Sequence, residues 1–189
     1  MKRLRASLDD VPIVDRGDYQ YFIHPLTDGV PRVDPALLRD VASEVIRRVD
    51  FDEVDVILAP EAMGIHLATA VSLQVDVPVA IARKRSYDLP GEVSVAQVTG
   101  YSENELYING IEPDDTVVVI DDVVSTGGTL SAITDALDAI GATLERFVVV
   151  FEKRGEGDPG APEGVPVEVL LGVAINDGLV EIIPDGCAN

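Results

Sequence analysis

Two adjacent acids and a turn of small residues follow a very apolar segment near the middle of the chain. Val117–Ile120 leads into Asp121 and Asp122, and two residues later comes a turn made of Ser125, Thr126, Gly127, Gly128 and Thr129. Backbone amides at the start of a helix, together with its positive end, bind anions such as phosphate. Carboxylates repel phosphate but accept hydrogen bonds from hydroxyl groups. The pattern therefore predicts a site for a phosphorylated sugar, with phosphate in the turn and hydroxyls on the acids.

The simplest alternative is a strand that ends in a solvated turn, in which the acids only favour the start of the next helix. That role needs one acid and one glycine rather than a dense run of small and hydroxyl residues. The sequence contains neither the GK[ST] of a Walker A loop nor a GxSxG motif. Residues 155–160 fit GxGxxG, but their acids and Pro159 are unsuited to the start of a helix.

A second candidate anion contact is the basic run Arg83, Lys84 and Arg85, which holds three of the 14 basic residues. It directly follows an apolar segment, 77–82, that we expect to form a strand. In a chain of formal net charge -20, such a cluster at a strand end indicates contact with a strongly negative ligand. A solvated loop that is basic by chance is the alternative.

The chain carries 34 acidic residues among its 189, and only three of its basic residues are lysines. Acids spread along the whole chain, together with few lysines, favour a halophilic source, where molar salt shortens the Debye length to about 3 Å and screens self-repulsion. An acidic mesophilic protein is the alternative. A basic surface for nucleic acid is not expected. No apolar run approaches the ~20 residues that cross a membrane, no signal peptide is recognised, and Cys187 is the single cysteine. We therefore expect a cytoplasmic protein without membrane contact.

The apolar patterns predict alternating strands and helices. The expected strands are 54–59, 77–82, 117–120 and 146–151, and the expected helices are 34–49, 62–73 and 129–140. Asp34 is the expected N-cap of the first helix, and Gly141 follows the last one as its C-cap. This alternation indicates an α/β fold with a central, mainly parallel sheet flanked by helices. In such sheets, ligands bind beyond the carboxyl ends of the strands.

Two regions interrupt the alternation. Residues 83–110 show few helical signals and contain short expected strands at 93–98 and 105–108, so a flap is expected at about 86–109. The C-terminal part predicts two strands around the turn Asn176–Gly178. A small hood is expected from about 12–30 and 165–185. We expect all of residues 1–189 to form a single domain.

The segment VVVIDDVVSTGGT resembles, at every position, the signature with which type I phosphoribosyltransferases bind phosphoribosyl pyrophosphate. Further segments, APEAMG, RKRSYDLPGEV and YSENELYI, are similar to parts of the purine branch, especially the adenine phosphoribosyltransferases. With them the resemblance covers about residues 12–150. An archaeal group similar to hypoxanthine-guanine phosphoribosyltransferases has DDVxSTGGT loops and looks nearest to this sequence. The resemblance implies the type I phosphoribosyltransferase fold, with a flap and a small hood.

By this resemblance, Asp121 and Asp122 would hold the ribose hydroxyls, and the turn 125–129 would hold the 5′-phosphate. The turn Ala62, Met63 and Gly64 would contact pyrophosphate, which Arg83 and Lys84 would neutralise. Mg²⁺ would bridge pyrophosphate and ribose oxygens, bound mostly through substrate and water. Glu105, in the flap, is the candidate catalytic acid that handles the proton of the base. Three nearby acids, Asp88, Glu92 and Glu103, are the alternatives.

The purine base is expected to contact the segment Tyr21, Phe22, Ile23 and His24, where the two aromatic rings could stack on it. Met63 stands where adenine enzymes have arginine, and Ser125 where hypoxanthine-guanine enzymes have an acid. The C-terminal hairpin resembles the hood of xanthine and hypoxanthine-guanine enzymes, which slightly favours hypoxanthine or guanine. An adenine-specific enzyme and a non-catalytic sensor of phosphoribosyl pyrophosphate are the alternatives. The family also implies a homodimer.

Overall fold

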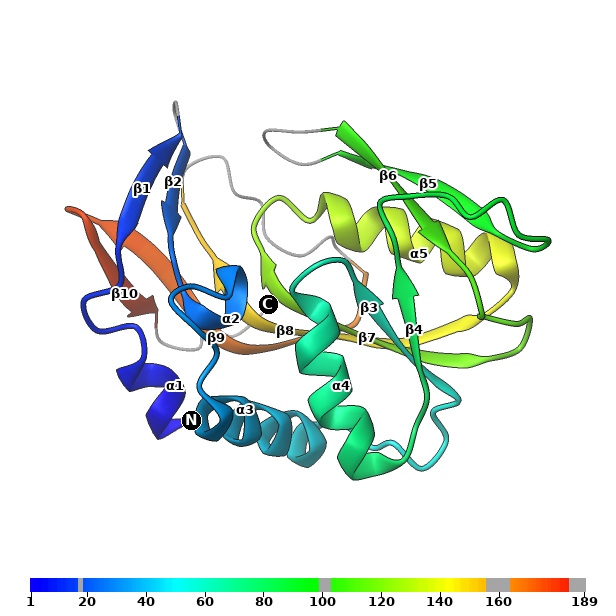
Figure 1. Cartoon of the computed structure of the whole chain (residues 1–189), viewed down its shortest axis with the longest axis horizontal. Coiled ribbons are helices and arrows are strands. Elements are labelled where there is room, and N and C mark those ends of the chain that lie inside the picture. Colours follow the sequence, from blue (N-terminus) through cyan, green and yellow to red (C-terminus); the bar gives the residue numbers. More distant parts are fainter. Residues whose placement is uncertain (17–18, 99–102, 156–163, 184–189) are drawn as a thin grey trace.

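A six-stranded sheet forms the centre of the protein (Figure 1), in the computed structural model that describes residues 1–16, 19–98, 103–155 and 164–183. The strand order is β10-β9-β8-β7-β3-β4. The strands are β3 (Val56–Pro60), β4 (Val79–Ala82), β7 (Thr116–Val124), β8 (Thr143–Lys153), β9 (Val167–Asn176) and β10 (Leu179–Ile183). Every neighbouring pair is parallel except β9 with β10, which confirms the expected mainly parallel sheet.

Side chains of β7 alternate between two hydrophobic cores, one on each face of the sheet. Val118 and Ile120 belong to the first core, with α3 (Pro35–Arg48) and α4 (Gly64–Val75). Val117 and Val119 belong to the second, with α5 (Gly128–Ile140). Figure 1 shows α1 (Lys2–Ala6), α3 and α4 on one side of the sheet and α5 on the other. A strand covered on both faces reads as a continuous apolar run, which explains the sequence of β7.

The remaining elements are two antiparallel strand pairs and one short helix, α2 (Pro25–Asp28). The strands β1 (Ile13–Arg16) and β2 (Tyr19–Phe22) form one pair, and β5 (Val93–Val98) and β6 (Glu103–Ile108) form the other. The second pair lies within the expected flap and packs beside α5, with Leu106 and Ile108 in the second core. The strands β9 and β10 were expected in a cap with the first pair, but they extend the main sheet through the pairing of β9 with β8.

Several element ends differ from the expected ones. The strand expected to end at Ile120 continues to Val124, because β7 stays paired with β8 as far as Val124 and Glu152. Asp121 and Asp122 are therefore strand residues. The helix expected from Ala62 begins at Gly64, because the two preceding residues form a turn. Both expected caps are confirmed: the Asp34 side chain accepts from the Ala36 amide at 3.0 Å, and Gly141 caps α5 at φ 88°.

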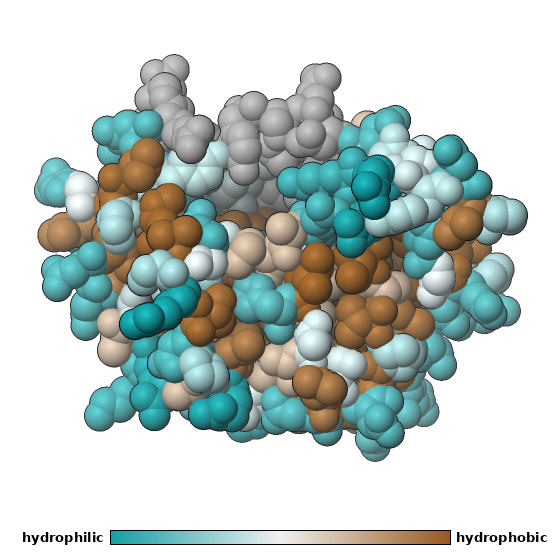
Figure 2. Space-filling view, viewed as in Figure 1, coloured by the Kyte–Doolittle hydropathy of each residue, from teal (hydrophilic) through white to brown (hydrophobic). Residues whose placement is uncertain are grey.

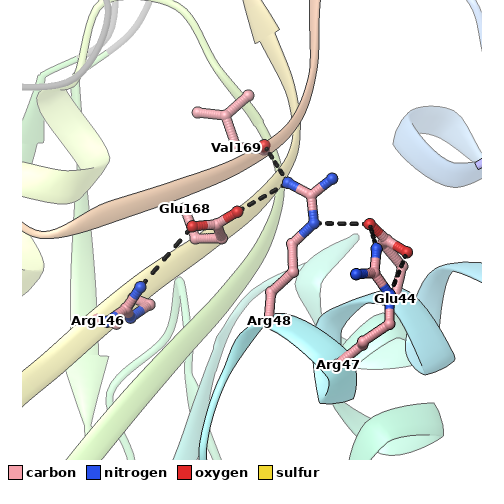
Figure 3. A network of polar contacts seen from close by, with 6 residues as sticks. All are labelled: Glu44, Arg47, Arg48, Arg146, Glu168 and Val169. Carbon is pink, nitrogen blue, oxygen red and sulfur yellow. Dashed lines mark hydrogen bonds and ion pairs between the residues drawn. The ribbon is translucent and has the colours of Figure 1, made fainter. Parts of the chain in front are cut away.

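A polar network fixes the end of α3 to the sheet (Figure 3). The buried Glu44 carboxylate accepts hydrogen bonds from Arg47 and Arg48 of the same helix. Arg48 also donates to Glu168 at 2.7 Å and to the carbonyl of Val169 at 3.0 Å, both on β9. Because the network joins residues about 120 positions apart in the sequence, it holds α3 against β9. None of the described helices is long and apolar enough to span a bilayer.

Candidate functional site

The turn between β7 and α5 encloses a cavity of about 70 Å³, lined by Val123, Val124, Ser125, Thr126, Gly127, Gly128, Thr129 and Leu130. Gly127 is the N-cap of α5 and adopts a left-handed conformation at φ 74°, which glycine tolerates best. No side chain of the described residues caps α5. The backbone amides of the first helical turn therefore face a small polar cavity at the positive end of the helix, an arrangement that suits an anion. All five turn residues expected to hold phosphate line this cavity.

Asp121 and Asp122 precede this turn on β7. Asp121 is 7% exposed, and its Oδ1 accepts the Asp122 backbone amide at 2.9 Å. Burial raises the pKa of Asp121, although hydrogen bonds from Asp122 and the nearby charge of Lys84 oppose that rise. Burial, followed by repulsion from Asp121, raises the pKa of Asp122 well above its usual value, and Asp28 of α2 adds to the effect. The protein thus gives the pair too few hydrogen-bond donors and too little positive charge to offset burial. A ligand with hydroxyl groups could supply the missing donors.

The turn after β3 lies against the end of β7. A side chain added at Gly64 would put its Cβ 2.7 Å from the carbonyl oxygen of Ile120 and 3.3 Å from Oδ1 of Asp121. Glycine is therefore required for α4 to begin so close to the acid pair. In the same turn, the peptide bond between Glu61 and Ala62 is cis. Ala62 is exposed and Met63 is half-buried.

The basic run follows β4, the neighbour of β3. Nε of Arg83 lies 2.9 Å from Oε2 of Glu61 and forms an ion pair with it. The angles do not meet those of a hydrogen bond, and this buried nitrogen has no hydrogen-bond partner among the described residues. The Lys84 backbone amide donates to the same oxygen of Glu61 at 3.2 Å. The guanidinium carbons of Arg83 and Arg85 lie 5.9 Å and 5.0 Å from the centre of the Tyr87 ring. Glu61 thus links the turn after β3 to the basic run after β4.

The carboxyl ends of three adjacent parallel strands therefore hold the residues expected to bind phosphoribosyl pyrophosphate. Strand order places β7, β3 and β4 side by side, so the phosphate turn, the Ala62–Gly64 turn and the basic run share one edge of the sheet. The sequence interpretation missed the roles of Glu61 and Tyr87. Glu61 was part of the segment APEAMG, but the ion pair that gives it a role depends on a residue 22 positions later in the sequence.

Glu92, near the start of the expected flap, is a third residue whose structural role the sequence did not show. Its carboxylate accepts hydrogen bonds from the Ser86 hydroxyl, the Tyr87 amide at 3.0 Å and the Asn109 side chain at 2.7 Å. These bonds, with that from Asn109 the strongest contributor, lower the pKa of Glu92 to about 2. Since Ser86 and Asn109 are the two ends of the 86–109 segment, Glu92 joins them. Glu105, the candidate catalytic acid, is exposed on β6 and accepts a hydrogen bond from the Tyr107 hydroxyl.

The expected base-binding segment divides between surface and core. Tyr21 and Ile23 are half-buried, whereas Phe22 and His24 are buried. The Phe22 ring packs edge-on against Phe151 at 5.5 Å, and the His24 ring does the same at 5.0 Å. His24 accepts from the Leu26 amide through Nδ1 at 3.1 Å, so its other nitrogen, Nε2, donates to the Ser7 hydroxyl at 2.9 Å. Burial lowers the pKa of His24 to about 4, so the ring is neutral at pH 7. The structure thus places two of the four candidates in the core rather than on a surface that a base could reach.

Residues 34–167 match the family described as phosphoribosyl transferase domain. The chain belongs to the type I phosphoribosyltransferase family. It is 55% identical to HGPRTase-like protein 2 of Natrialba magadii, over 96% of this chain and 99% of that one. It is 49% identical to the HGPRTase-like protein of Halobacterium salinarum, over 98% of both chains. Among solved structures, the adenine phosphoribosyltransferase of Thermoanaerobacter pseudethanolicus superposes with a TM-score of 0.73 at 18% identity, covering 90% of this chain and 98% of that one. This last similarity supports the fold.

Proposed function

We propose that the protein is a purine phosphoribosyltransferase of purine salvage, which transfers phosphoribosyl from phosphoribosyl pyrophosphate to hypoxanthine or guanine. The products are a nucleoside 5′-monophosphate and pyrophosphate. The observation that carries the proposal is the convergence, at one edge of the sheet, of a phosphate-sized turn, an acid pair in which Asp121 is buried and Asp122 half-buried, and a basic run. These three devices match the 5′-phosphate, the ribose hydroxyls and the pyrophosphate of a single substrate.

In the proposed reaction, a nitrogen of the base attacks the anomeric carbon of ribose while the bond from this carbon to pyrophosphate breaks. The bonding electrons leave with pyrophosphate, and the proton of the base nitrogen passes to an acceptor, for which Glu105 is the candidate. Positive charge develops on the ribose ring, and the ionised pair Asp121 and Asp122 stabilises it. Arg83 and Lys84 stabilise the negative charge of the departing pyrophosphate. The protein otherwise positions the reactants and excludes water.

Mg²⁺ fits this site as an ion held mainly by the substrate. The described residues contain no group of three or more His, Cys, Asp or Glu side chains arranged to hold a metal. The carboxylates of Asp121 and Asp122 supply oxygen atoms of the kind that Mg²⁺ prefers, and Mg²⁺ usually keeps several waters and substrate phosphates as ligands. When bound, the ion would neutralise part of the charge of pyrophosphate.

Two alternative functions would use the same pocket, one with a different base and one without catalysis. Adenine as the base is supported by the segments similar to adenine enzymes, whereas the relatives at about 50% identity are named HGPRTase-like. A non-catalytic sensor of phosphoribosyl pyrophosphate is supported by Met63, which replaces an arginine of the adenine enzymes. We also propose that the protein acts as a homodimer.

The deciding experiment is an assay of pyrophosphate release with phosphoribosyl pyrophosphate, Mg²⁺ and each free base in turn. The assay is run in low and in molar KCl, because the large excess of acids makes activity at low salt a poor test. Release with hypoxanthine or guanine, and formation of the corresponding monophosphate, is the expected result. Release with adenine alone would support the first alternative. If no base supports release at any salt concentration while the protein still binds phosphoribosyl pyrophosphate, the protein is a sensor and the enzyme proposal is wrong.

A further inference from the structure

The segment expected to bind the base leads into α2, and hydrogen bonds in both directions fix this short helix. Nδ1 of His24 accepts the Leu26 amide at 3.1 Å, and Oδ2 of Asp28 accepts the His24 amide at 2.9 Å. The Thr27 hydroxyl also donates to Oδ2 of Asp28. The His24 ring is buried against Phe151 in the core. His24 therefore anchors a helix that ends in the exposed Asp28.

The end of α2 lies at the candidate site. A Cβ added at Gly29, the C-cap of α2, would lie 3.7 Å from Cε of Met63 in the turn before α4. Figure 1 shows α2 beside the start of α4, and Figure 2, viewed from the same side, shows hydrophilic surface at this place among more hydrophobic regions. The helix also lies close to β7, and the charge of Asp28 adds to the raised pKa of Asp122. Asp28 therefore belongs to the same edge of the sheet as the acid pair.

The Asp28 carboxylate is suited to accept hydrogen bonds from N–H groups of a ligand. Its side chain is exposed, and both of its hydrogen bonds among the described residues end at Oδ2, which leaves Oδ1 for a ligand. A negative charge repels phosphate groups, so the 5′-phosphate and pyrophosphate are unsuited to this position. The described residues contain no set of three acids arranged to hold a metal, so Asp28 does not complete a cation site with the acid pair. The part of the substrates that remains is the base, whose edge carries N–H donors.

We propose that Asp28 selects the base, by accepting hydrogen bonds from N1–H and from the 2-amino group of guanine. This inference rests on the proposed function of the pocket. Guanine offers both donors, hypoxanthine offers N1–H alone, and adenine presents an unprotonated N1 that the carboxylate repels. Hydrogen bonds to a charged acceptor are stronger than neutral ones, and a polar group left unpaired costs free energy, so the bases differ strongly in affinity. The expected order of preference is guanine, then hypoxanthine, then adenine.

The test is the equilibrium binding of three nucleoside 5′-monophosphates to the full chain, measured by titration calorimetry in molar KCl. GMP, IMP and AMP carry the three bases, and GMP differs from IMP only in the 2-amino group. The wild-type protein should bind GMP at least about 10-fold more tightly than IMP, which is the size of one hydrogen bond to a charged group. AMP should bind more weakly than IMP.

The variant Asp28→Asn replaces the free acceptor with a donor and keeps the cap of α2. Its amide oxygen can accept the bonds from His24 and Thr27 that now end at Oδ2, and its amide nitrogen then takes the place of Oδ1. The preference for GMP over AMP should therefore fall at least about 10-fold. Asp76→Asn is the matched control, because it removes the same charge from an exposed residue, the C-cap of α4, and should keep the wild-type preference.

The affinity for phosphoribosyl pyrophosphate separates base selection from a purely structural role of Asp28. Asp28→Asn should bind this ligand at least as tightly as the wild-type protein, because it removes a negative charge near a polyanion. Equal weakening of this ligand and of all three monophosphates would indicate a structural role and overturn the proposal. A wild-type protein without a preference for GMP, or an unchanged preference in Asp28→Asn, would also overturn it. Because binding needs no turnover, a preference for GMP without pyrophosphate release would support this inference and contradict the proposed enzyme activity.

Discussion

The acid pair on β7 and the single acid Glu92 at the base of the flap segment have opposite electrostatic environments. Burial and mutual repulsion raise the pKa of Asp122, and burial raises that of Asp121. Three donors from Asn109, Ser86 and Tyr87 lower the pKa of Glu92 to about 2. The hydrogen-bonding capacity of Glu92 is met by its own chain, and that of the acid pair is not. The comparison indicates that Glu92 stabilises the 86–109 segment, whereas the acid pair has unmet hydrogen-bonding capacity that a ligand could use.

The difference follows from where each acid lies in the fold. Asp121 and Asp122 are adjacent strand residues. Among the described residues, the backbone amide of Asp122 is the one seen to donate to this pair, and it donates to Asp121. Glu92 lies before β5, where the two ends of the 86–109 segment meet and bring side-chain and backbone donors together. Three variants, one of them measured for both activity and stability, test this contrast between a ligand site and a structural anchor.

The largest loss of activity is expected from Gly64→Ala, which disturbs the acid pair without changing an acid. The added Cβ would lie 2.7 Å from the Ile120 carbonyl oxygen, so either α4 or the end of β7 must move. Because a displacement of about 1 Å near a reacting group can cost 10²-fold in rate, we expect kcat/KM to fall about 100-fold. Gly172→Ala is the control, since its Cβ would meet nothing closer than 3.6 Å. Equal effects of the two variants would show that the close approach at Gly64 is unimportant.

Asp122→Asn should lower kcat/KM by at least about 10-fold, which corresponds to ~1.4 kcal/mol of transition-state stabilisation. The amide keeps the shape of the carboxylate but carries no negative charge to oppose the positive charge on the ribose. Steady-state kinetics with the preferred base measure the effect. Asp138→Asn, an exposed substitution on α5, serves as the control and should retain full activity. Unchanged kinetics of the Asp122 variant would remove its proposed role.

Glu92→Gln should have a smaller effect, a decrease of kcat/KM of less than about 10-fold. Ser86 donates to one oxygen of Glu92, and Tyr87 and Asn109 donate to the other. Glutamine keeps one acceptor oxygen, but its amide nitrogen cannot accept the bonds made to the oxygen that it replaces. The loss should appear mainly in KM, because the carboxylate positions the flap segment and does not touch the reacting atoms. Glu112→Gln, in an exposed turn, is the matched control. A decrease in kcat as large as that of Asp122→Asn would contradict the structural role.

The smallest effect is a gain of stability in Asp122→Asn without ligand. The raised pKa means that the folded protein holds this proton to higher pH than the unfolded chain, whose aspartates have a pKa of about 3.9. As the pH rises above the unfolded pKa, the unfolded aspartate ionises more readily than the folded one. The folded state therefore loses stability relative to the unfolded chain, and at pH 7 the ionisation of Asp122 disfavours folding. Asparagine removes this cost. The free energy of unfolding at pH 7 should rise by about 1 kcal/mol, and Tm by about 2–4 °C.

This gain should be clearly smaller at pH 4, where close to half of the unfolded aspartate is also protonated. Scanning calorimetry at pH 4 and pH 7, in molar KCl, measures both values. A gain of equal size at the two pH values would mean that packing, rather than the ionisation of Asp122, is responsible. Greater stability together with lower activity in this one variant would be the clearest sign that the acid pair is kept for binding.

Much of the fold, and the meeting of the candidate site residues at one edge of the sheet, could be predicted because the signals are local in sequence. The apolar run of β7, the acids and the glycines of the following turn are contiguous, and so each constrains the conformation of the next. The boundary at Ile120 was wrong because pairing with β8, which no local pattern reports, extends β7 to Val124. The burial of the segment expected to bind the base could not be predicted for the same reason. Phe22 and His24 pack in the core against Phe151, which lies far along the chain.

The sequence by itself determined that the chain has an α/β fold, a turn of small and hydroxyl residues after two acids, and a strongly acidic composition. Only the tertiary structure decided that Glu61 pairs with Arg83, that Glu92 joins the ends of the flap segment, and that His24 is a core residue. The physical reason is that the features determined by the sequence depend on neighbouring residues and on composition. The second depends on side chains 17 to 22 positions apart, which only folding brings within hydrogen-bonding distance.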